Sequence, residues 1–167
     1  MGSKVLRPPI LDEKHAAFIA RGLSTVASST TSRGLPVIGR AAGCRVSTDR
    51  RQVTLLIDQS QSPALIDAIS SSGRIAVVFS EPTTHRTIQL KSGNASVAGL
   101  QKRDEKLIRE YADAFVAHVC SIGFEESLVR ALIWSDRATL AAVTFTPEEV
   151  FEQTPGPGAG KCMASSK

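Results

Sequence analysis

Arg40 and Arg45 are the residues whose type and spacing point most directly to chemistry. Each guanidinium offers planar N–H donors that match the oxygens of a phosphate monoester. The two residues are five apart in a predicted strand, so strict alternation would place them on opposite faces. Gly43 between them indicates a bulge or bend that would bring them to one face, although simple strand irregularity explains this glycine equally well. If the two guanidinium groups converge, they form a phosphate site.

A second polar group lies at a junction of short predicted strands between Ser72 and Leu100. One face of an antiparallel meander packs in the core, and the other face can contact a ligand. The polar residues on this meander are His85, Arg86, Thr87, Gln89 and Lys91. The segment is predicted to form, in order, a strand over 74–79, a turn over 80–83, a strand over 85–91, a turn over 92–94 and a strand over 95–100.

His85 is the histidine with the stronger functional case, because it opens a strand and directly precedes Arg86 and Thr87. A histidine at the end of a turn is nevertheless more often structural than functional. His118 has apolar neighbours in a predicted helix and is interpreted as a surface or core-edge residue. If the protein binds haem, either histidine is a candidate axial ligand.

Several catalytic and cofactor motifs are absent from the sequence. No glycine-rich loop has dinucleotide or P-loop spacing, and neither a zinc-protease histidine pair nor a Gly-x-Ser-x-Gly motif occurs. Cys44, Cys120 and Cys162 are odd in number and widely separated, which predicts free thiols in a reducing cytoplasm. The cysteines therefore give no reason to expect zinc, an iron–sulfur cluster or another metal.

The composition is that of a soluble globular protein, with 42% hydrophobic and 22% charged residues. The formal net charge of +4 is concentrated in one stretch where five arginines accompany a single acid, Asp49. Such a patch suits a phosphate-bearing ligand or nucleic acid, but basic loops are as often only solubilising. Nucleic acid is the weaker choice because only 5% of the residues are aromatic and able to stack on bases. The five arginines are Arg33, Arg40, Arg45, Arg50 and Arg51.

The chain is expected to be cytoplasmic and to have no membrane contact. No apolar run approaches the roughly 20 residues that a spanning helix needs, and no signal-peptide pattern opens the sequence. We expect one domain over 1–152, beginning with a lead-in helix. The remaining segment, 153–167, is rich in proline and glycine and is expected to be a flexible tail.

Helical and strand patterns together predict a mainly β protein with flanking helices. Many short antiparallel strands favour a small closed barrel over a doubly wound parallel sheet, because closure removes exposed edges. Helices are predicted over 11–22, 62–73 and 104–133, with Gly123 interrupting the last one. Outside the meander, strands are predicted over 24–31, 36–46, 53–57 and 139–145.

The order of these elements resembles the pyridoxamine 5′-phosphate oxidase-like proteins, the flavin-binding split-barrel group. The resemblance covers about residues 11–150 and is carried by two runs, Ile-Ala-Val-Val-Phe-Ser-Glu-Pro over 75–82 and His-Arg-Thr-Ile-Gln-Leu-Lys over 85–91. It implies a six-stranded antiparallel split β-barrel with flanking helices. It also implies FMN as cofactor and a homodimer with the flavin at the subunit interface.

The resemblance also implies a set of cofactor-binding positions. The two basic residues that hold the FMN phosphate in the family fall on Arg40 and Arg45, and Ser60 keeps a small hydroxyl. The family's basic pair at the helix start is replaced by Gln61 and Ser62, which removes contacts worth about 1.5 to 3 kcal/mol each. The full set of expected cofactor-binding residues is Arg40, Arg45, Ser60, Gln61, Ser62, Arg86, Thr87 and Gln89.

The expected function is that of an FMN-binding split-barrel protein, a flavin-dependent oxidoreductase acting on an unidentified small molecule. The flavin ring would carry the redox chemistry, and the protein would bind it and exclude water. The alternative is a non-catalytic split-barrel protein that binds another ligand, such as haem. Nucleic-acid binding through the arginine-rich hairpin is a third and weaker interpretation.

Overall fold

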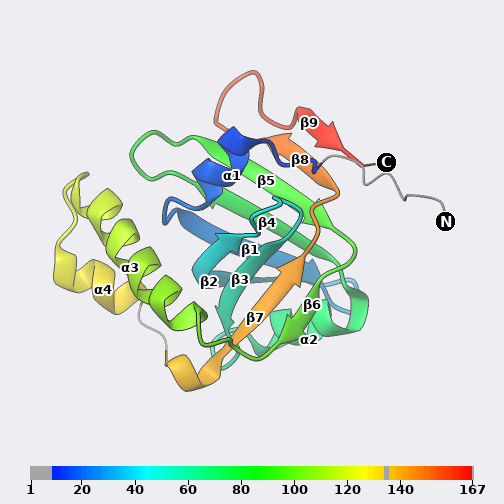
Figure 1. The fold of residues 1–167 in the computed structure, drawn as a ribbon, viewed down its shortest axis with the longest axis horizontal. Coiled ribbons are helices and arrows are strands. Elements are labelled where there is room, and N and C mark those ends of the chain that lie inside the picture. The colour runs from blue at the N-terminus through cyan, green and yellow to red at the C-terminus, as the bar shows by residue number, and fades with distance from the viewer. Residues whose placement is uncertain (1–8, 134–135, 167) are drawn as a thin grey trace.

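The computed structural model describes residues 9–133 and 136–166, which form one curled antiparallel sheet with helices around it (Figure 1). The prediction of a mainly β protein with helices is confirmed, but the predicted number of six strands is wrong, because nine strands form within the described residues. The strand order across the sheet is β6-β7-β3-β2-β1-β4-β5-β8-β9. The strands are β1 Ser24–Thr30, β2 Pro36–Val46, β3 Val53–Asp58, β4 Ile75–Ser80, β5 Thr87–Ser92, β6 Ser96–Ala98, β7 Leu140–Phe145, β8 Glu149–Glu152 and β9 Cys162–Ser165.

Two of the additional strands lie where the sequence signal is weakest. Residues 147–151 fit either a helical turn or an extended edge, and the structure gives the extended form as β8. The last strand, β9, lies inside 153–167 and pairs with β8, so residues 162–165 have the regular structure that a flexible tail would lack. The division of the chain at residue 152 stays a prediction, and residues 1–8 and 167 lie outside the described part.

The helices follow the predicted segments with adjusted ends. Asp12 caps α1 by accepting a hydrogen bond from the backbone N–H of His15 at 2.7 Å. Gly73 ends α2 in the left-handed conformation, with φ of 66°. Gly123 divides the predicted helix 104–133 in two and also has positive φ, 99°. The helices are α1 Glu13–Ile19, α2 Pro63–Ser72, α3 Asp104–Cys120 and α4 Glu126–Ile133, followed by the 3₁₀ turn η1 Arg137–Thr139.

The main core lies on the concave side of the sheet and is closed by α1 and α2. Phe18, Phe79 and Phe145 are its largest fully buried side chains. A smaller apolar cluster joins α3 to α4 through Phe115 and Val129, and these two helices form a pair at the left of Figure 1. Among the helices of the described segments, none is long and apolar enough to cross a lipid bilayer. Burial of apolar side chains from the strands, together with those of the helices, in this core provides the main stabilisation of the fold.

Strand β2 contains a bulge that sets the direction of its side chains. Ala41 pairs with Ile57 and Gly43 pairs with Leu56, so Ala42 is the extra residue. A bulge shifts the alternation of a strand by one residue. The irregularity expected near Gly43 is therefore confirmed, and Arg40 and Arg45 lie on one face of β2, which α3 crosses.

Candidate functional site

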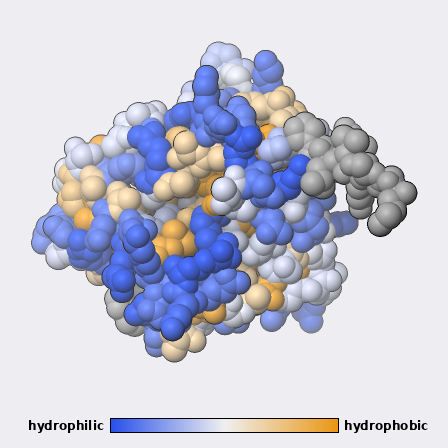
Figure 2. Space-filling model, viewed as in Figure 1, coloured by the Kyte–Doolittle hydropathy of each residue, from blue (hydrophilic) through white to orange (hydrophobic). Residues whose placement is uncertain are grey.

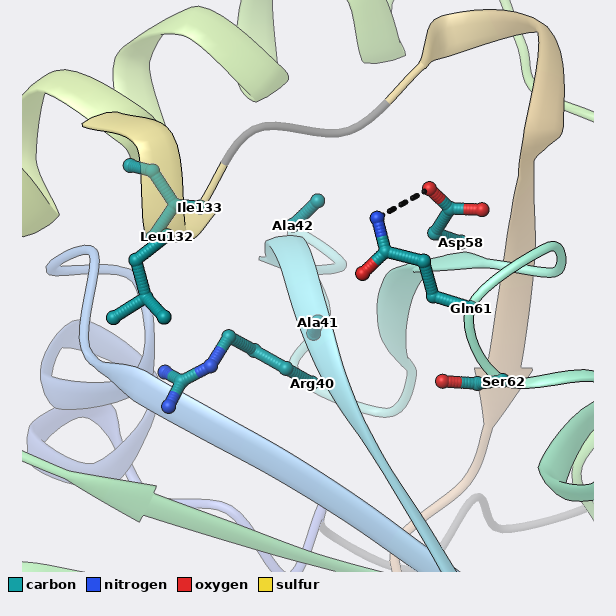
Figure 3. Close-up of a pocket in the computed structure, with 8 residues that line it drawn as sticks. All are labelled: Arg40, Ala41, Ala42, Asp58, Gln61, Ser62, Leu132 and Ile133. Atoms are coloured by element: carbon teal, nitrogen blue, oxygen red, sulfur yellow. Dashed lines mark hydrogen bonds between the residues drawn. The ribbon is translucent and has the colours of Figure 1, made fainter. Parts of the chain in front are cut away.

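A small polar pocket lies where the bulged part of β2 meets the end of β3 and the start of α2 (Figure 3). Its volume is about 40 Å³, and α4 covers it from one side. The pocket brings together three residues of the expected cofactor site, namely Arg40, Gln61 and Ser62. The complete lining consists of Arg40, Ala41, Ala42, Asp58, Gln61, Ser62, Leu132 and Ile133.

Strand β2 and helix α2 approach each other closely beside this pocket. A Cβ atom on Gly39 would lie 2.5 Å from Ser62 Oγ and 2.8 Å from Leu65 Cδ2. Distances this short leave no room for a side chain, so glycine is required for the contact. Pro63 opens α2 directly after Ser62, where a missing N–H and a fixed φ suit the first helical turn.

Asp58 is the organising residue of the pocket, and only 4% of it is exposed. Its Oδ1 accepts hydrogen bonds from Ser60 N at 2.9 Å and Ser60 Oγ at 2.6 Å, and its Oδ2 accepts from Gln61 Nε2 at 3.2 Å. Burial would raise the pKa of Asp58, but hydrogen bonds from Ser60, Thr139 and the backbone outweigh burial and hold the pKa below its ordinary 3.8. The pocket therefore contains a carboxylate at neutral pH.

Arg40 joins this pocket to a second, larger space. Its Nη1 donates to Ser24 Oγ at 3.3 Å, and its guanidinium lies 5.8 Å from the centre of the Phe115 ring. Ser24 and Phe115 both line a groove of about 480 Å³ between the rim of the sheet and α3. Figure 3 shows the Arg40 side chain extending beneath Leu132 at the edge of the pocket. A ligand that spans the groove and the pocket would pass this guanidinium.

Arg45 does not join Arg40 at a common point. Its Nε donates to Asp104 Oδ1 at 3.0 Å, and Asp104 is fully buried at the start of α3. Arg40 meets the same helix at Phe115, eleven residues further on, or about 16 Å along the axis at roughly 1.5 Å per residue. The bulge thus places both arginines on one face of β2. Their charged ends nevertheless contact α3 at two different positions along its axis.

The larger groove has one apolar wall and one hydroxyl-bearing wall. Phe115, Val119 and Ile122 of α3 and its following turn form the apolar side. On the other side, Ser80 and Thr87 hydrogen bond to each other through their hydroxyl oxygens at 2.7 Å. Figure 2 shows hydrophobic patches on the α3–α4 side of the molecule, surrounded by hydrophilic residues. The groove is lined by Ser24, Ser80, Glu81, Pro82, His85, Thr87, Phe115, Val119, Ile122, Phe124 and Pro155.

The loop over 81–86 closes one end of the groove. Glu81 is buried and receives Arg21 Nη2 at 2.9 Å and the Thr84 hydroxyl at 2.6 Å. His85 N donates to the carbonyl of Glu81 at 2.9 Å, which turns the chain and leaves His85 in the left-handed region with φ of 61°. This conformation is uncommon for a residue other than glycine. His85 lines the groove at its exposed end.

The remaining expected site residues lie elsewhere or have other contacts. The Arg86 guanidinium covers the Phe18 ring at 4.3 Å, and Gln89 Oε1 accepts from Gln153 Nε2 at 3.3 Å. Neither of these residues lines the groove or the small pocket. His118 also lies outside both spaces, and its Nδ1 is buried without a hydrogen-bond partner. The structure thus gathers Arg40, Gln61 and Ser62, with Ser60 next to them and Thr87 in the groove.

Three of the five arginines in the arginine-rich stretch are paired with acids, two of them from other parts of the chain. Arg45 pairs with Asp104, Arg50 Nη1 lies 2.9 Å from Glu13 Oε1, and Arg51 Nε lies 3.8 Å from Asp49 Oδ2. The charge excess in this part of the sequence therefore does not form one open basic surface. Within the described segments, no group of three or more histidine, cysteine or acidic residues could hold a metal ion.

Sequence reasoning missed three residues of the site, namely Ser24, Asp58 and Phe115. Asp58 gives the clearest signal, because it is an acid placed directly between a buried apolar strand and a helix that begins with proline. Ser24 and Phe115 have no comparable signal. The first is one of several serines in its strand, and the second belongs to the regular apolar face of α3.

No family model and no curated protein sequence matches this chain. Solved structures match it over most of its length. An F420 reductase matches at 10% identity with a TM-score of 0.54, covering 84% of this chain and 98% of that chain. HupZ of Group A Streptococcus matches at 12% identity with a TM-score of 0.52, covering 90% and 99%. A "putative pyridoxamine 5′-phosphate oxidase" from Lactobacillus delbrueckii matches at 16% identity with a TM-score of 0.51, covering 84% and 93%. The likeness to these structures is consistent with a split-barrel fold, although the sheet of the described residues is curled, with β6 and β9 as its two ends, and does not have the expected six strands.

Proposed function

We propose that this chain, which has the split-barrel fold of the pyridoxamine 5′-phosphate oxidase-like proteins, binds a flavin and acts as an oxidoreductase on a small molecule. FMN is the flavin that the sequence resemblance implies. The observation that carries the proposal is the position of Arg40, which contacts Ser24 and Phe115 of the groove and also lines the small pocket. One guanidinium connects a space suited to a ring with a polar space suited to the ligand's tail.

The groove fits the isoalloxazine ring in size and in polarity. Its volume of about 480 Å³ lies in the usual range of small-molecule sites, roughly 300 to 1,000 Å³. The apolar wall of Phe115, Val119 and Ile122 suits a ring face, while Ser24 and Thr87 offer hydroxyls to the ring's polar edge. A bound flavin would supply hydride or electron transfer. The role of the chain is to orient the ring and to exclude water from one face of it.

The tail of the flavin would lie beside Arg40, Gln61 and Ser62. These residues provide one guanidinium, one amide and one hydroxyl, all at the lining of the same pocket. Arg45 would have to leave Asp104 before it could contact a phosphate. The fit is therefore good for the ring and the hydroxyl-bearing chain of a flavin, and the phosphate of FMN meets a single arginine.

A groove-filling variant tests the flavin proposal. Ile122 is exposed and lines the groove, so Ile122→Arg introduces bulk and charge there with little risk to folding. We expect this variant to lose flavin binding, measured by quenching of flavin fluorescence during titration of the purified protein. Ser127→Arg is the matched control, because Ser127 is exposed and lies outside the groove. Equal flavin binding by Ile122→Arg and the control would contradict the proposal.

We also propose that the protein forms a homodimer whose second copy covers the site. The support is a set of exposed large apolar side chains around it, because such patches mark interaction surfaces. Ile38 is 71% exposed and lies two residues before Arg40, and Leu132 is 64% exposed and lines the small pocket. Light scattering during size-exclusion chromatography should give twice the chain mass, and Leu132→Arg should give a monomer. If the wild-type protein were a monomer at high concentration, the proposed homodimer would be contradicted.

The second candidate function is non-catalytic binding of another ligand, with haem as the named case. The observation that favours it is His85, an imidazole-bearing residue that lines the groove. Absorption spectra of the purified protein distinguish flavin binding from haem binding, because a flavin gives two visible-range bands and haem gives one intense Soret band.

A cytoplasmic location is part of the proposal as well, and fractionation of cells that express the chain would test it.

A further inference from the structure

We infer that the pocket beside Arg40 is built for an uncharged, hydroxyl-bearing end of the ligand and not for a phosphate dianion. This inference rests on the proposed function, because it concerns the tail of the flavin that the groove would hold. The inference distinguishes between two flavins, riboflavin and FMN, which share the ring and the ribityl chain. Riboflavin ends in a hydroxyl, whereas FMN ends in a phosphate.

The charge of the pocket is balanced without a ligand. Arg40 and Asp58 are the two ionisable residues of its lining. Asp58 is buried and is held as a carboxylate by hydrogen bonds from Ser60 and Gln61. A phosphate dianion placed here would gain one guanidinium and would face one carboxylate in a partly desolvated space. Like charges at short distance in such a space are strongly unfavourable.

The polar atoms that remain available match a hydroxyl. Gln61 Nε2 donates one of its two N–H groups to Asp58, so the second N–H and the acceptor Oε1 remain available. Figure 3 shows Gln61 Oε1 and Ser62 Oγ directed from the α2 side toward the β2 strand that carries Arg40. A hydroxyl both donates and accepts, and could therefore donate to Gln61 Oε1 and accept from the Ser62 hydroxyl, whereas the Arg40 guanidinium extends away from both of them toward Leu132 (Figure 3). A phosphate dianion has no proton to donate to Gln61 Oε1.

The second arginine that a phosphate would need is held elsewhere. Arg45 lies on the correct face of β2, but its Nε bonds to a fully buried carboxylate on Asp104. Withdrawing Arg45 would leave that carboxylate unpaired in the interior, which is strongly unfavourable. The pocket volume of about 40 Å³ also provides room for only a few atoms, since one water molecule needs roughly 10 to 15 Å³ on the same measure.

The test compares riboflavin and FMN on the same full-length protein, freed of bound ligand, by fluorescence titration and calorimetry. We expect riboflavin to bind as tightly as FMN, with dissociation constants within about threefold of each other. Gln61→Lys adds a cation to the pocket and should shift the preference toward FMN by about tenfold or more. Gln59→Lys is the matched control, because Gln59 is exposed, two residues away and outside the lining. Circular dichroism melts verify that both variants fold.

Each outcome of this comparison decides a different point. Tenfold tighter binding of FMN by the wild-type protein, on the order of 1.4 kcal/mol, would overturn the inference and leave the flavin proposal intact. An equal shift in Gln61→Lys and Gln59→Lys would show that the tail does not reach this pocket, and would also overturn it. Absence of binding for both flavins would remove the proposed function and the inference together.

Discussion

Arg45 donates from Nε to Oδ1 of Asp104 at 3.0 Å, and this contact attaches β2 to the first turn of α3. The other carboxylate oxygen, Oδ2, accepts from the backbone N–H of Gln101 at 2.8 Å. An acidic side chain in the first turn also interacts favourably with the positive end of the helix dipole. Arg45, which the sequence resemblance predicts to bind phosphate, thus has a structural partner in Asp104. An experiment can distinguish the ligand-binding role of Arg45 from its structural role.

Replacing Arg45 with methionine should destabilise the fold and leave flavin affinity unchanged. The variant keeps the apolar length of the side chain but leaves Asp104 buried and unpaired. Breaking a buried ion pair in this way lowers the free energy of unfolding by about 3 kcal/mol. Urea denaturation followed by circular dichroism measures the loss. The Arg45→Met, Asp104→Leu double variant should recover most of it, because apolar replacement of both partners is nearly neutral. A stable single variant with weakened flavin binding would instead place Arg45 in the ligand site.

Replacing Arg40 with methionine should have the opposite effect. Arg40 is exposed and its charged end contacts only the Ser24 hydroxyl and the Phe115 ring among the interactions described. We expect little change in stability. Loss of one charge-assisted hydrogen bond, about 1.5 kcal/mol, should weaken flavin binding by about tenfold. Parallel denaturation and fluorescence titrations check both parts, and a loss of stability without a loss of affinity would reverse the assignment.

Alanine at Gly39 should disturb the contact between β2 and α2. Its Cβ would lie 2.5 Å from Ser62 Oγ and 2.8 Å from Leu65 Cδ2, so the helix start must shift. Overpacking of this kind lowers the free energy of unfolding by about 1 to 3 kcal/mol, which thermal melts detect. Gly99→Ala is the control, since a Cβ at Gly99 meets no atom within 4 Å. Equal stability of the two variants would show that β2 and α2 can separate freely.

Asp58 should contribute to the acid sensitivity of the protein. Its pKa is lower in the folded state than the ordinary 3.8, because hydrogen bonds to the carboxylate outweigh its burial. Its stabilising contribution is therefore complete above the ordinary pKa and is lost as pH falls through the lower folded-state value. We expect Asp58→Asn to be less stable than wild type at neutral pH, with the difference shrinking below pH 3.8. Urea denaturation across this range measures the difference, and a constant difference would contradict the assignment.

The three cysteines should react with a thiol reagent at very different rates. Cys162 is exposed on β9, Cys120 is partly buried, and Cys44 is buried in the core. Burial raises the pKa of the Cys44 thiol, which removes the reactive thiolate. A colorimetric titration should show one fast thiol, lost in Cys162→Ser, and should reveal Cys44 only after unfolding. Rapid modification of Cys44 in the folded protein would show that β2 opens readily.

The sequence was sufficient for those parts of the fold that depend on local pattern. The spacing of apolar residues predicts α2 and α3, and Gly123 marks the break between α3 and α4. Gly43 points to the bulge in β2 because a glycine within a strand is a local signal. The short strands β8 and β9 were harder to predict, because their pairing depends on neighbours distant in sequence.

The site could be predicted only where residues are close in sequence. Gln61 and Ser62 lie at a helix start, and their place beside Arg40 follows from packing of that helix on β2. The pairing of Arg45 with Asp104 spans 59 positions, and no local pattern specifies it. The sequence therefore indicated which residues are polar and on which face they lie, whereas tertiary packing decided which partner each one meets.

The extra residue in β2 can be lost without reversing the faces of the strand. If Ala42 were deleted, Ala41 and Gly43 would be adjacent and would still pair with Ile57 and Leu56, so the two halves of β2 would join in regular register. Arg40 and Arg45 would then be four positions apart on one face, and Cys44 would stay in the core. In an alignment with a related chain, a one-residue gap here would indicate a regular strand in place of the bulge, with the same residues facing inward.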